Sequence, residues 1–279
     1  MIGTRRIASK VGRGITSPLR LLPDFIVIGG KKCGTSSLYN YLAEHPGVAP
    51  AFRKEVHFFD NNPGRRGTLF YRAYFPTSLY RRRVERVRGT KLLTGEATPY
   101  YLFYPLAPRR VRDVVPDAKL IALLRNPVDR AYSHYHHEVR NGTEGLSFEE
   151  AIEREAERLG GEQERMLRSD GYDSASHRRY SYLSRGIYVD QIRNWRDHFP
   201  EEQLLILRSE DLFADPASVL SQTLDFLGLP PLEREEYSKD NKGSYLGMDP
   251  AIRGRLAEYF KPHNERLYKY LDRDFGWDR

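Results

Sequence analysis

The chain has 279 residues, of which 39% are hydrophobic and 30% are charged, and its formal net charge is +7. This composition excludes an intrinsically disordered chain, and no run of about 18 apolar residues encodes a membrane-spanning helix. The positive charge favours acidic partners: a nucleotide, an anionic glycan, nucleic acid or a membrane surface. The single cysteine, Cys33, excludes an intramolecular disulfide and favours a reducing compartment, so we expect a cytoplasmic protein.

Residues 1–22 are a basic N-terminal extension, and we expect one domain over residues 23–279. The extension has no acidic residue and lacks the apolar core of a signal peptide. Its charges are Arg5, Arg6, Lys10, Arg13 and Arg20. We expect a flexible arm, with peripheral contact to an anionic membrane through residues 1–22 as the alternative.

The first strong pattern is a strand, a glycine loop and a helix. Residues 25–28 form a buried strand, residues 29–35 form the loop, and Thr35 or Ser36 is expected to cap the helix. The apolar face of this helix comprises Leu38, Tyr41 and Leu42. Loop amides and a helix N-terminus together favour binding of an anion.

This loop departs from the P-loop pattern G-x-x-x-x-G-K-[ST]. Gly29, Gly34 and Ser36 occupy the expected positions, but Thr35 stands where the lysine belongs and Lys32 lies inside the loop. In a P-loop that lysine reaches the terminal phosphates and the hydroxyl holds magnesium. The displaced lysine indicates a ligand other than a magnesium triphosphate, while a P-loop kinase remains an alternative.

A second candidate site follows the apolar run Lys119–Leu124, which predicts a central parallel strand. Arg125 lies at its carboxyl end, where open α/β sheets bind ligands. Pro127 suits the first turn of a helix, and Ser133 lies about two turns along it. An arginine and a hydroxyl in this arrangement are suited to a phosphate group.

These motifs resemble those of sulfotransferases that use PAPS (3′-phosphoadenosine 5′-phosphosulfate). Residues 32–38 resemble the 5′-phosphosulfate loop, K-x-G-T-[ST]-x-L, and residues 125–133 resemble the 3′-phosphate motif, R-[ND]-P-x-x-R-x-x-S. Residues 54–60, KEVHFFD, resemble a segment of the heparan-sulfate type of these enzymes. The resemblance spans roughly residues 23–279.

The resemblance implies PAPS as donor, PAP as product and no metal requirement. A third match, Lys242 with Gly243, resembles the loop that closes over the nucleotide, although Ser244 replaces the arginine common there. The donor-binding residues implied are Lys32, Cys33, Gly34, Thr35, Ser36, Ser37, Arg125, Ser133, Lys242 and Gly243. The three histidines at 134, 136 and 137 lack a carboxylate pattern for a metal, so they are interpreted as helix-face residues.

For catalysis, the resemblance assigns Glu55 as the base that receives the acceptor's proton. His57 is the competing base, because histidine titrates near neutral pH. If residues 54–58 are extended, both side chains point into one cleft. Lys32 is the candidate for neutralising charge on the leaving phosphate.

The remaining pattern alternates strands with helices. Strands are expected at Lys91–Gly95 and Leu204–Leu207, and helices are expected after Ser147, from Asp215 to about Leu227, and after Asp249. The last of these helices should present Leu256, Tyr259 and Phe260 on its apolar side. This alternation predicts an α/β fold: a P-loop-like parallel sheet flanked by helices on both faces.

The predicted function is sulfuryl transfer from PAPS to an acceptor hydroxyl, of a carbohydrate, with no nucleic-acid partner. Segments 65–90 and 147–185 are candidates for the walls of the acceptor cleft. Ala97 stands where several heparan-sulfate-type enzymes have a lysine, so heparan-like recognition of the acceptor does not carry over. The non-enzymatic alternative is a basic protein that binds nucleic acid or a membrane surface.

Overall fold

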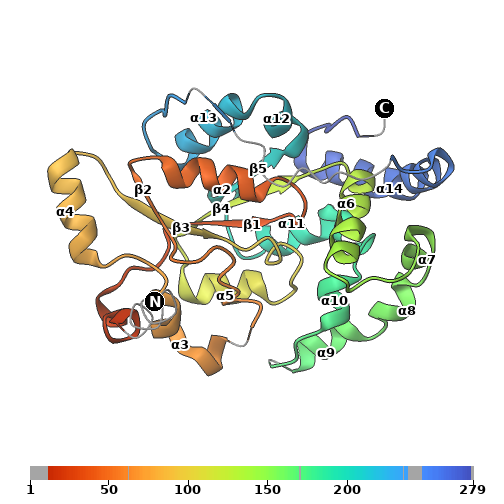
Figure 1. The fold of residues 1–279 in the computed structure, drawn as a ribbon, viewed down its shortest axis with the longest axis horizontal. Coiled ribbons are helices and arrows are strands. Elements are labelled where there is room, and N and C mark those ends of the chain that lie inside the picture. The colour runs from red at the N-terminus through yellow and green to blue at the C-terminus, as the bar shows by residue number, and fades with distance from the viewer. Residues whose placement is uncertain (1–11, 62, 170, 235, 238–246, 278–279) are drawn as a thin grey trace.

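The computed structural model describes residues 12–61, 63–169, 171–234, 236–237 and 247–277. Its centre is a parallel sheet of five strands in the order β2-β3-β1-β4-β5 (Figure 1). The strands are β1 (Phe25–Gly29), β2 (Val48–Pro50), β3 (Leu93–Ala97), β4 (Lys119–Leu124) and β5 (Leu204–Arg208). The predicted parallel α/β sheet is confirmed, and β1 lies at its middle.

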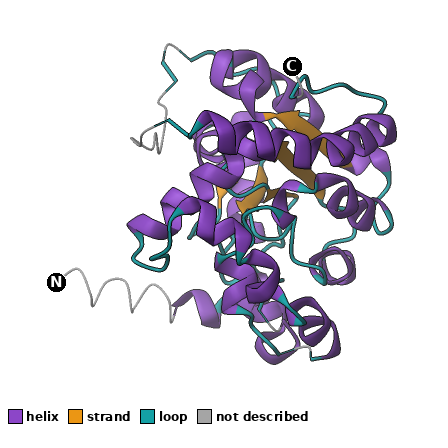
Figure 2. Ribbon diagram, turned by 90° about the vertical axis from the view of Figure 1, so that its right-hand side faces the viewer, coloured by secondary structure: helices purple, strands orange, loops and turns teal. Residues whose placement is uncertain are grey.

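Both faces of the sheet are buried, because helices cover each of them (Figure 2). All five residues of β1 are buried, and their side chains alternate between two hydrophobic clusters. Phe25 and Val27 belong to one cluster, and Ile26 and Ile28 to the other. This burial explains why the strand is a continuous apolar run rather than an alternating one.

One face is covered by α2 (Thr35–Glu44), α12 (Ser209–Ala214) and α13 (Pro216–Leu227), which lie above the sheet in Figure 1. The predicted apolar face of α2 is confirmed, since Leu38, Tyr41 and Leu42 are all buried. This packing fixes the direction of α2, whose N-terminus follows directly from β1 and its loop.

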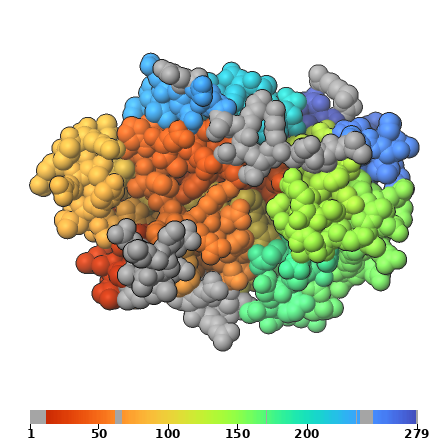
Figure 3. All heavy atoms as spheres, in the orientation of Figure 1, coloured from red at the N-terminus to blue at the C-terminus, as the bar shows by residue number. Residues whose placement is uncertain are grey.

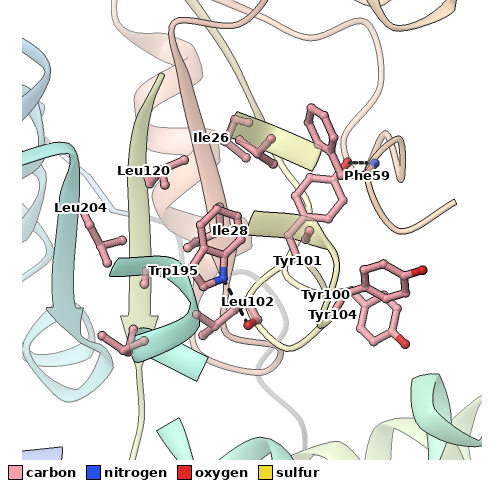
Figure 4. Close-up of a cluster of buried hydrophobic side chains, with 14 of the residues drawn as sticks. Ile26, Ile28, Phe59, Tyr100, Tyr101, Leu102, Tyr104, Leu120, Trp195 and Leu204 are labelled. Carbon is pink, nitrogen blue, oxygen red and sulfur yellow. Dashed lines mark hydrogen bonds between the residues drawn. The ribbon is translucent and has the colours of Figure 1, made fainter. Parts of the chain in front are cut away.

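The opposite face is covered by α5 (Ala107–Val114), α11 (Tyr188–Arg196) and a buried aromatic segment. Figure 4 shows Tyr101 and Trp195 packed around Ile28 and Leu120 of the sheet. The indole nitrogen of Trp195 donates a hydrogen bond of 3.3 Å to the carbonyl of Leu102. The polar end of this large side chain is therefore satisfied inside the core.

A further group of helices lies beside the sheet, around α6 (Pro127–Arg140), and is joined by a third hydrophobic cluster. Val128 and Ala131 of α6 pack there with Phe148 and Phe260. The other helices of this group are α7 (Phe148–Glu153), α8 (Glu155–Leu159), α9 (Glu162–Arg168), α10 (Ala175–Arg179) and α14 (Pro250–Leu271). Short 3-10 helices lie at Ser17–Leu19, Ser184–Gly186 and Glu201–Gln203.

Three predicted helix starts are confirmed by their caps. Ser147 and Glu150 form a reciprocal capping box at α7. Asp215 accepts a hydrogen bond from the Ser218 amide at α13, and Asp249 caps α14 in the same way. Such caps satisfy backbone donors that the helix itself leaves without partners.

Other details of the prediction are wrong. Thr35 and Ser36 do not cap α2, because the helix already begins at Thr35 and Gly34 is its N-cap. The predicted strand at Lys91–Gly95 is shifted by two residues relative to β3. Tyr259 of α14 is 41% exposed, so it lies outside the apolar side formed by its neighbours.

The described part of the basic extension, residues 12–22, packs against the body instead of forming a free arm. The Arg13 Nε donates to the Ala73 carbonyl at 2.7 Å, and an Arg20 amino group donates to the Phe75 carbonyl at 2.6 Å. Both acceptors lie just beyond α3 (Pro63–Arg72) and before α4 (Ser78–Arg88). The domain boundary at residue 23 stays a prediction. Among the described residues, no helix combines the length and apolarity needed to cross a membrane.

Candidate active site

The candidate site lies at the carboxyl ends of the central strands β1 and β4. The loop after β1 carries Lys32, and Arg125 follows β4 directly. The Gly30 amide donates to the Leu123 carbonyl at 2.7 Å, which ties the start of the loop to β4. The two predicted anion-binding motifs therefore meet at the edge of the sheet where this architecture binds ligands.

Gly34 makes the sharp transition from the loop into α2. Its φ is 85°, and a Cβ placed on it would lie 3.0 Å from side-chain atoms of Leu212 and Phe213. Both features favour glycine at this position. Because no side chain caps α2, the positive end of the helix is available to an anion at the mouth of the loop.

The other loop residues divide into buried and site-facing groups. Cys33, Thr35 and Ser37 are buried, and burial raises the pKa of the Cys33 thiol. The Cys33 carbonyl accepts a 2.8 Å hydrogen bond from the Ser209 hydroxyl. Ser36 is half-buried and accepts a hydrogen bond from the Lys54 ammonium. Cys33 therefore holds the loop against the core, while Ser36 links α2 to the next segment of the site.

Arg125 and Lys32 lie next to each other. A guanidinium nitrogen of Arg125 donates to the Lys32 carbonyl at 3.2 Å, and the guanidinium lies 5.6 Å from the ring centroid of Phe213. Burial lowers the pKa of Lys32, and the positive charges of Arg140 and Arg125 lower it further. In the described part of the chain no carboxylate pairs with the Lys32 ammonium. A bound anion would relieve this repulsion.

Ser133 lies on α6, about two turns beyond Pro127 as predicted, and is 5% exposed. The N-terminus of α6 is fixed by Asn126, whose side chain accepts a hydrogen bond from the Val128 amide at 2.9 Å. The predicted closing loop with Lys242 and Gly243 lies outside the described residues.

Glu55 and His57 come together with an unpredicted partner, Asp60. The His57 Nε2 lies 3.5 Å from a Glu55 oxygen, and its Nδ1 lies 2.6 Å from a carboxylate oxygen of Asp60. The Lys54 ammonium is 4.0 Å from Glu55 and also contacts Ser36 of α2. This chain of contacts connects the candidate base to the anion-binding loop.

Residues 54–58 are not extended, so the condition for placing Glu55 and His57 on one face by strand alternation is not met. Glu55 has a φ of 59° and His57 a φ of 54°, so both have a left-handed backbone conformation. The Glu55 amide donates to the Ala97 carbonyl at 3.0 Å, and the Phe58 amide donates to the Tyr101 hydroxyl at 2.8 Å. These tertiary hydrogen bonds hold a conformation that costs energy for residues with a side chain.

The pKa values of this pair move in opposite directions. Burial lowers the pKa of His57, but hydrogen bonds to Asp60 and Glu55 outweigh it and raise the pKa to about 9. The hydrogen bond from His57 lowers the pKa of Glu55, with Lys54 adding to the effect. At neutral pH, His57 therefore carries a proton and Glu55 is an ionised acceptor.

A buried carboxylate, Glu96, is linked to residues 54–60 through the Tyr101 hydroxyl. Its oxygens accept hydrogen bonds from the hydroxyls of Tyr71 at 2.6 Å and Thr98 at 2.6 Å, and Tyr101 adds a third at 3.2 Å. Burial raises the pKa of Glu96. The neighbouring Ala97 is fully buried at the end of β3 and presents no cation.

Comparisons with known proteins identify the family. The sulfotransferase domain family model matches residues 22–245. The chain belongs to the sulfotransferase family. It is 32% identical to a sulfotransferase from Alicyclobacillus acidocaldarius of known crystal structure, with a TM-score of 0.67 over 93% of this chain and 100% of that one. The predicted fold and family are confirmed, and a P-loop kinase or a non-enzymatic binding protein is not favoured.

The alignments with two curated relatives extend over most of this chain. It is 30% identical to membrane-associated sulfotransferase kil1 of Dictyostelium discoideum, over 94% of this chain and 68% of the relative. It is 31% identical to human heparan sulfate glucosamine 3-O-sulfotransferase 3B1, over 92% of this chain and 65% of that protein. The chain thus spans about two thirds of the length of these relatives.

Sequence reasoning missed a partly buried lysine, Lys31, in the loop after β1. The Lys31 ammonium lies 2.6 Å from a Glu138 oxygen and 2.9 Å from the His134 Nε2. Burial lowers the pKa of Lys31 to about 7, Arg185 adds to this effect, and Glu138 opposes it. His134 lies on α6 and is fully buried, so the helix face that carries it is turned towards the protein interior. Two adjacent lysines therefore have different surroundings, which their shared residue type could not indicate.

The two segments predicted as acceptor-cleft walls have different locations. Arg178, from segment 147–185, lies at the site, with a guanidinium nitrogen 2.8 Å from Asp60. By contrast, Arg81 of α4 pairs with Asp24, which precedes β1 and lies at the opposite end of the sheet. The expectation that arginines of segment 65–90 line the site is therefore wrong for α4.

Metal-binding residues were not predicted for this sulfotransferase. In the described ranges, His, Cys, Asp and Glu side chains nowhere form a group of three suited to a metal ion. Independence from metal stays a prediction, and it is tested below by donor-product binding in the presence of a chelator.

The raised pKa of His57 predicts a pH-dependent contribution to stability. Its folded pKa, about 9, exceeds the ordinary value of 6.5, so the stabilisation is complete below pH 6.5 and is lost as the pH rises through about 9. We expect about 2–3 kcal/mol for this side chain, which is 28% exposed. Urea unfolding at several pH values should show this fall in the wild type and a shallower fall in His57→Gln. Identical pH profiles would contradict the pairing.

Proposed function

We propose that the protein transfers a sulfuryl group from PAPS to a hydroxyl group of a carbohydrate. One observation carries the proposal: Lys32 and Arg125 lie beside the N-terminus of α2, and the Glu55–His57 pair is tied to the same helix through Lys54. An anion-binding loop and a candidate base thus share one edge of the sheet, as in-line transfer between two oxygens requires.

The residues present fit the donor. The N-terminus of α2, together with Lys32 and Ser36, would hold the 5′ end, and Arg125 with Ser133 would hold the 3′-phosphate. PAPS would supply an activated sulfuryl group on its 5′-phosphate. The close approach of the backbone at Gly34 and the depressed pKa of Lys32 both suit an anion at this loop.

Glu55 is the proposed base. Its lowered pKa keeps it ionised at neutral pH, and its side chain is 45% exposed, so an acceptor hydroxyl can reach it. His57 holds its proton up to about pH 9 and therefore serves as a positioning residue between Glu55 and Asp60. Lys32 would neutralise negative charge that develops on the leaving phosphate.

A carbohydrate acceptor is supported by the relatives. Several of them are named as heparan sulfate sulfotransferases, including human 3B1 and mouse 6. Arg178, beside Asp60, supplies a partly exposed cation on the acceptor side. Ala97 supplies no cation. We therefore propose that acceptor recognition depends less on acceptor carboxylates than it would with a lysine at position 97.

The donor assignment predicts that PAP binds without metal and that Arg125→Ala weakens it. Removing a charge-assisted contact should lower the affinity by roughly 2–5 kcal/mol. Isothermal calorimetry in EDTA measures this, with Arg253→Ala as the control, because Arg253 is an exposed arginine paired with Asp129 on the surface. Tight ATP–magnesium binding with no PAP binding would contradict the donor assignment.

The acceptor assignment is tested with PAPS and a panel of acceptors. We expect transfer to oligosaccharides, with similar rates on neutral and uronic-acid-containing chains and a weak dependence on salt. Transfer restricted to phenols or small apolar alcohols would reject the carbohydrate while leaving the donor chemistry intact.

We also propose that the protein associates peripherally with anionic membranes. The name of the relative kil1 describes a membrane-associated sulfotransferase, and the extension over residues 1–22 is basic without an acidic residue. The test is sedimentation of the full chain with neutral and anionic phospholipid vesicles.

A further inference from the structure

Helix α4 carries apolar side chains that the fold does not bury. None of its residues is buried, and Leu79, Tyr80 and Val87 are 75%, 50% and 78% exposed. In Figure 1 the helix lies at the left end of the molecule, away from the sheet. A single exposed leucine needs no explanation, but three such side chains on one short helix do.

These three side chains form one stripe. At about 100° per residue they fall within roughly 100° of the helix circumference, and Arg83 lies among them. Arg82 and Arg86 flank the stripe on the side of Leu79, and both are exposed. The whole helix holds five arginines and one acid, Glu85. We call Leu79, Tyr80 and Val87 the α4 apolar stripe.

The side of α4 opposite the stripe attaches the helix to the body. Arg81 pairs with Asp24, an Arg88 nitrogen donates to the Pro46 carbonyl at 2.5 Å, and Glu85 accepts from the Leu92 amide at 3.0 Å. All three anchors lie more than about 120° from the centre of the stripe. The stripe therefore faces solvent, and the only acid of the helix is turned towards the body.

The apolar surface continues onto the N-terminal segment. The Ser78 hydroxyl donates to the Leu19 carbonyl at 3.2 Å, which places Leu19 beside the start of α4. Leu19 is 66% exposed and nearby Ile15 is 77% exposed. At one end of the molecule, these exposed apolar side chains thus lie near Arg82, Arg83 and Arg86, which pair with no carboxylate of the described residues.

We propose that the α4 apolar stripe docks on an anionic phospholipid bilayer, with α4 lying in the plane of the headgroups. This rests on the peripheral association proposed above and specifies its surface. An amphipathic helix with arginines beside a solvent-facing apolar stripe has the chemistry of interfacial membrane binding. A glycan or a nucleic acid would pair with the arginines but would leave Leu79 and Val87 in water.

The position of α4 also suits the candidate reaction. Asp24, the partner of Arg81, precedes β1, whereas the donor loop follows β1. In Figure 1, α4 lies at the left end of the molecule, as its atoms do in Figure 3, whereas α10, which carries Arg178, lies to the right of the sheet. Docking through α4 therefore leaves the active-site edge open to an acceptor.

Vesicle sedimentation of the full chain tests the surface. We use neutral phosphatidylcholine vesicles and vesicles with about 30% phosphatidylserine, across a salt series. Wild type should bind only the anionic vesicles. The pair Leu79→Ser, Val87→Ser should lower the partition coefficient about tenfold, and the triple Arg82→Glu, Arg83→Glu, Arg86→Glu at least as much. The matched controls Leu167→Ser and Arg168→Glu, exposed on α9, should bind as wild type does.

The outcomes separate the two proposals. No binding by wild type would overturn peripheral association itself. Binding that both α4 variants retain would overturn the α4 surface alone and assign the contact elsewhere. A triple variant that binds vesicles normally but loses affinity for a sulfated glycan would also overturn it, in favour of a polyanion site. Thermal unfolding and turnover on a soluble acceptor should match wild type in every α4 variant, which shows that folding is intact.

Discussion

Replacing Glu55 with glutamine should lower turnover by about 10²–10⁴-fold, the usual contribution of a general base. Glutamine keeps the size of the side chain and can still accept the hydrogen bond from His57, whose Nε2 lies 3.5 Å away. Glutamine and glutamate should also be equally strained by the left-handed backbone conformation at this position. The loss should therefore be chemical, with kcat and kcat/KM falling together and PAP affinity nearly unchanged. Steady-state kinetics with calorimetry of PAP binding measure both.

Two variants bracket this result. Glu44→Gln changes an exposed carboxylate at the far end of α2, where it pairs with Arg234, and should leave turnover intact. His57→Gln should cost less turnover than Glu55→Gln, because His57 is already protonated at neutral pH and only positions Glu55. If Glu55→Gln were nearly silent and His57→Gln severe, the base would be His57.

The sequence predicted those parts of the site in which chemistry and local structure coincide. Lys32 lies in the loop after one buried strand and Arg125 directly follows another, so strand pattern and residue type sufficed to place both at one edge of the sheet. The glycine loop over residues 29–35 was predicted for the same reason, because it joins a buried strand to a helix.

Tertiary contacts determine what the sequence did not reveal. The left-handed backbone at Glu55 and His57 depends on two acceptors about 40 residues downstream, the Ala97 carbonyl and the Tyr101 hydroxyl. Arg178 reaches Asp60 from 118 positions along the chain, in a segment without clear periodicity. No local pattern encodes such a contact. Asp60 itself stood within the quoted motif, so only its pairing with His57 was missed.

Lys32→Ala should reduce turnover by about 10²–10³-fold while reducing PAP affinity by less than about tenfold. The ammonium acts on charge that develops during transfer, so most of its benefit belongs to the transition state. Three features support this assignment: burial and neighbouring cations depress its pKa, no described carboxylate neutralises it, and Arg125 fixes its backbone carbonyl. Both lysine and alanine carry a Cβ, so the φ of 70° at this residue disfavours them alike.

Lys31→Ala is the matched control, because it removes the same side chain one residue earlier. There the loss leaves the buried Glu138 carboxylate without the ammonium 2.6 Å away, so the main effect should be on stability. Comparing kcat, PAP affinity and the midpoint of thermal unfolding for the two variants separates the roles. Equal losses of turnover and PAP affinity in Lys32→Ala would mean that Lys32 contributes to binding and not to catalysis. The transition-state assignment requires that Lys32→Ala is folded, binds PAP and turns over slowly. If the variant instead lost much of its thermal stability and a proportionate share of its activity, Lys32 would be a structural residue.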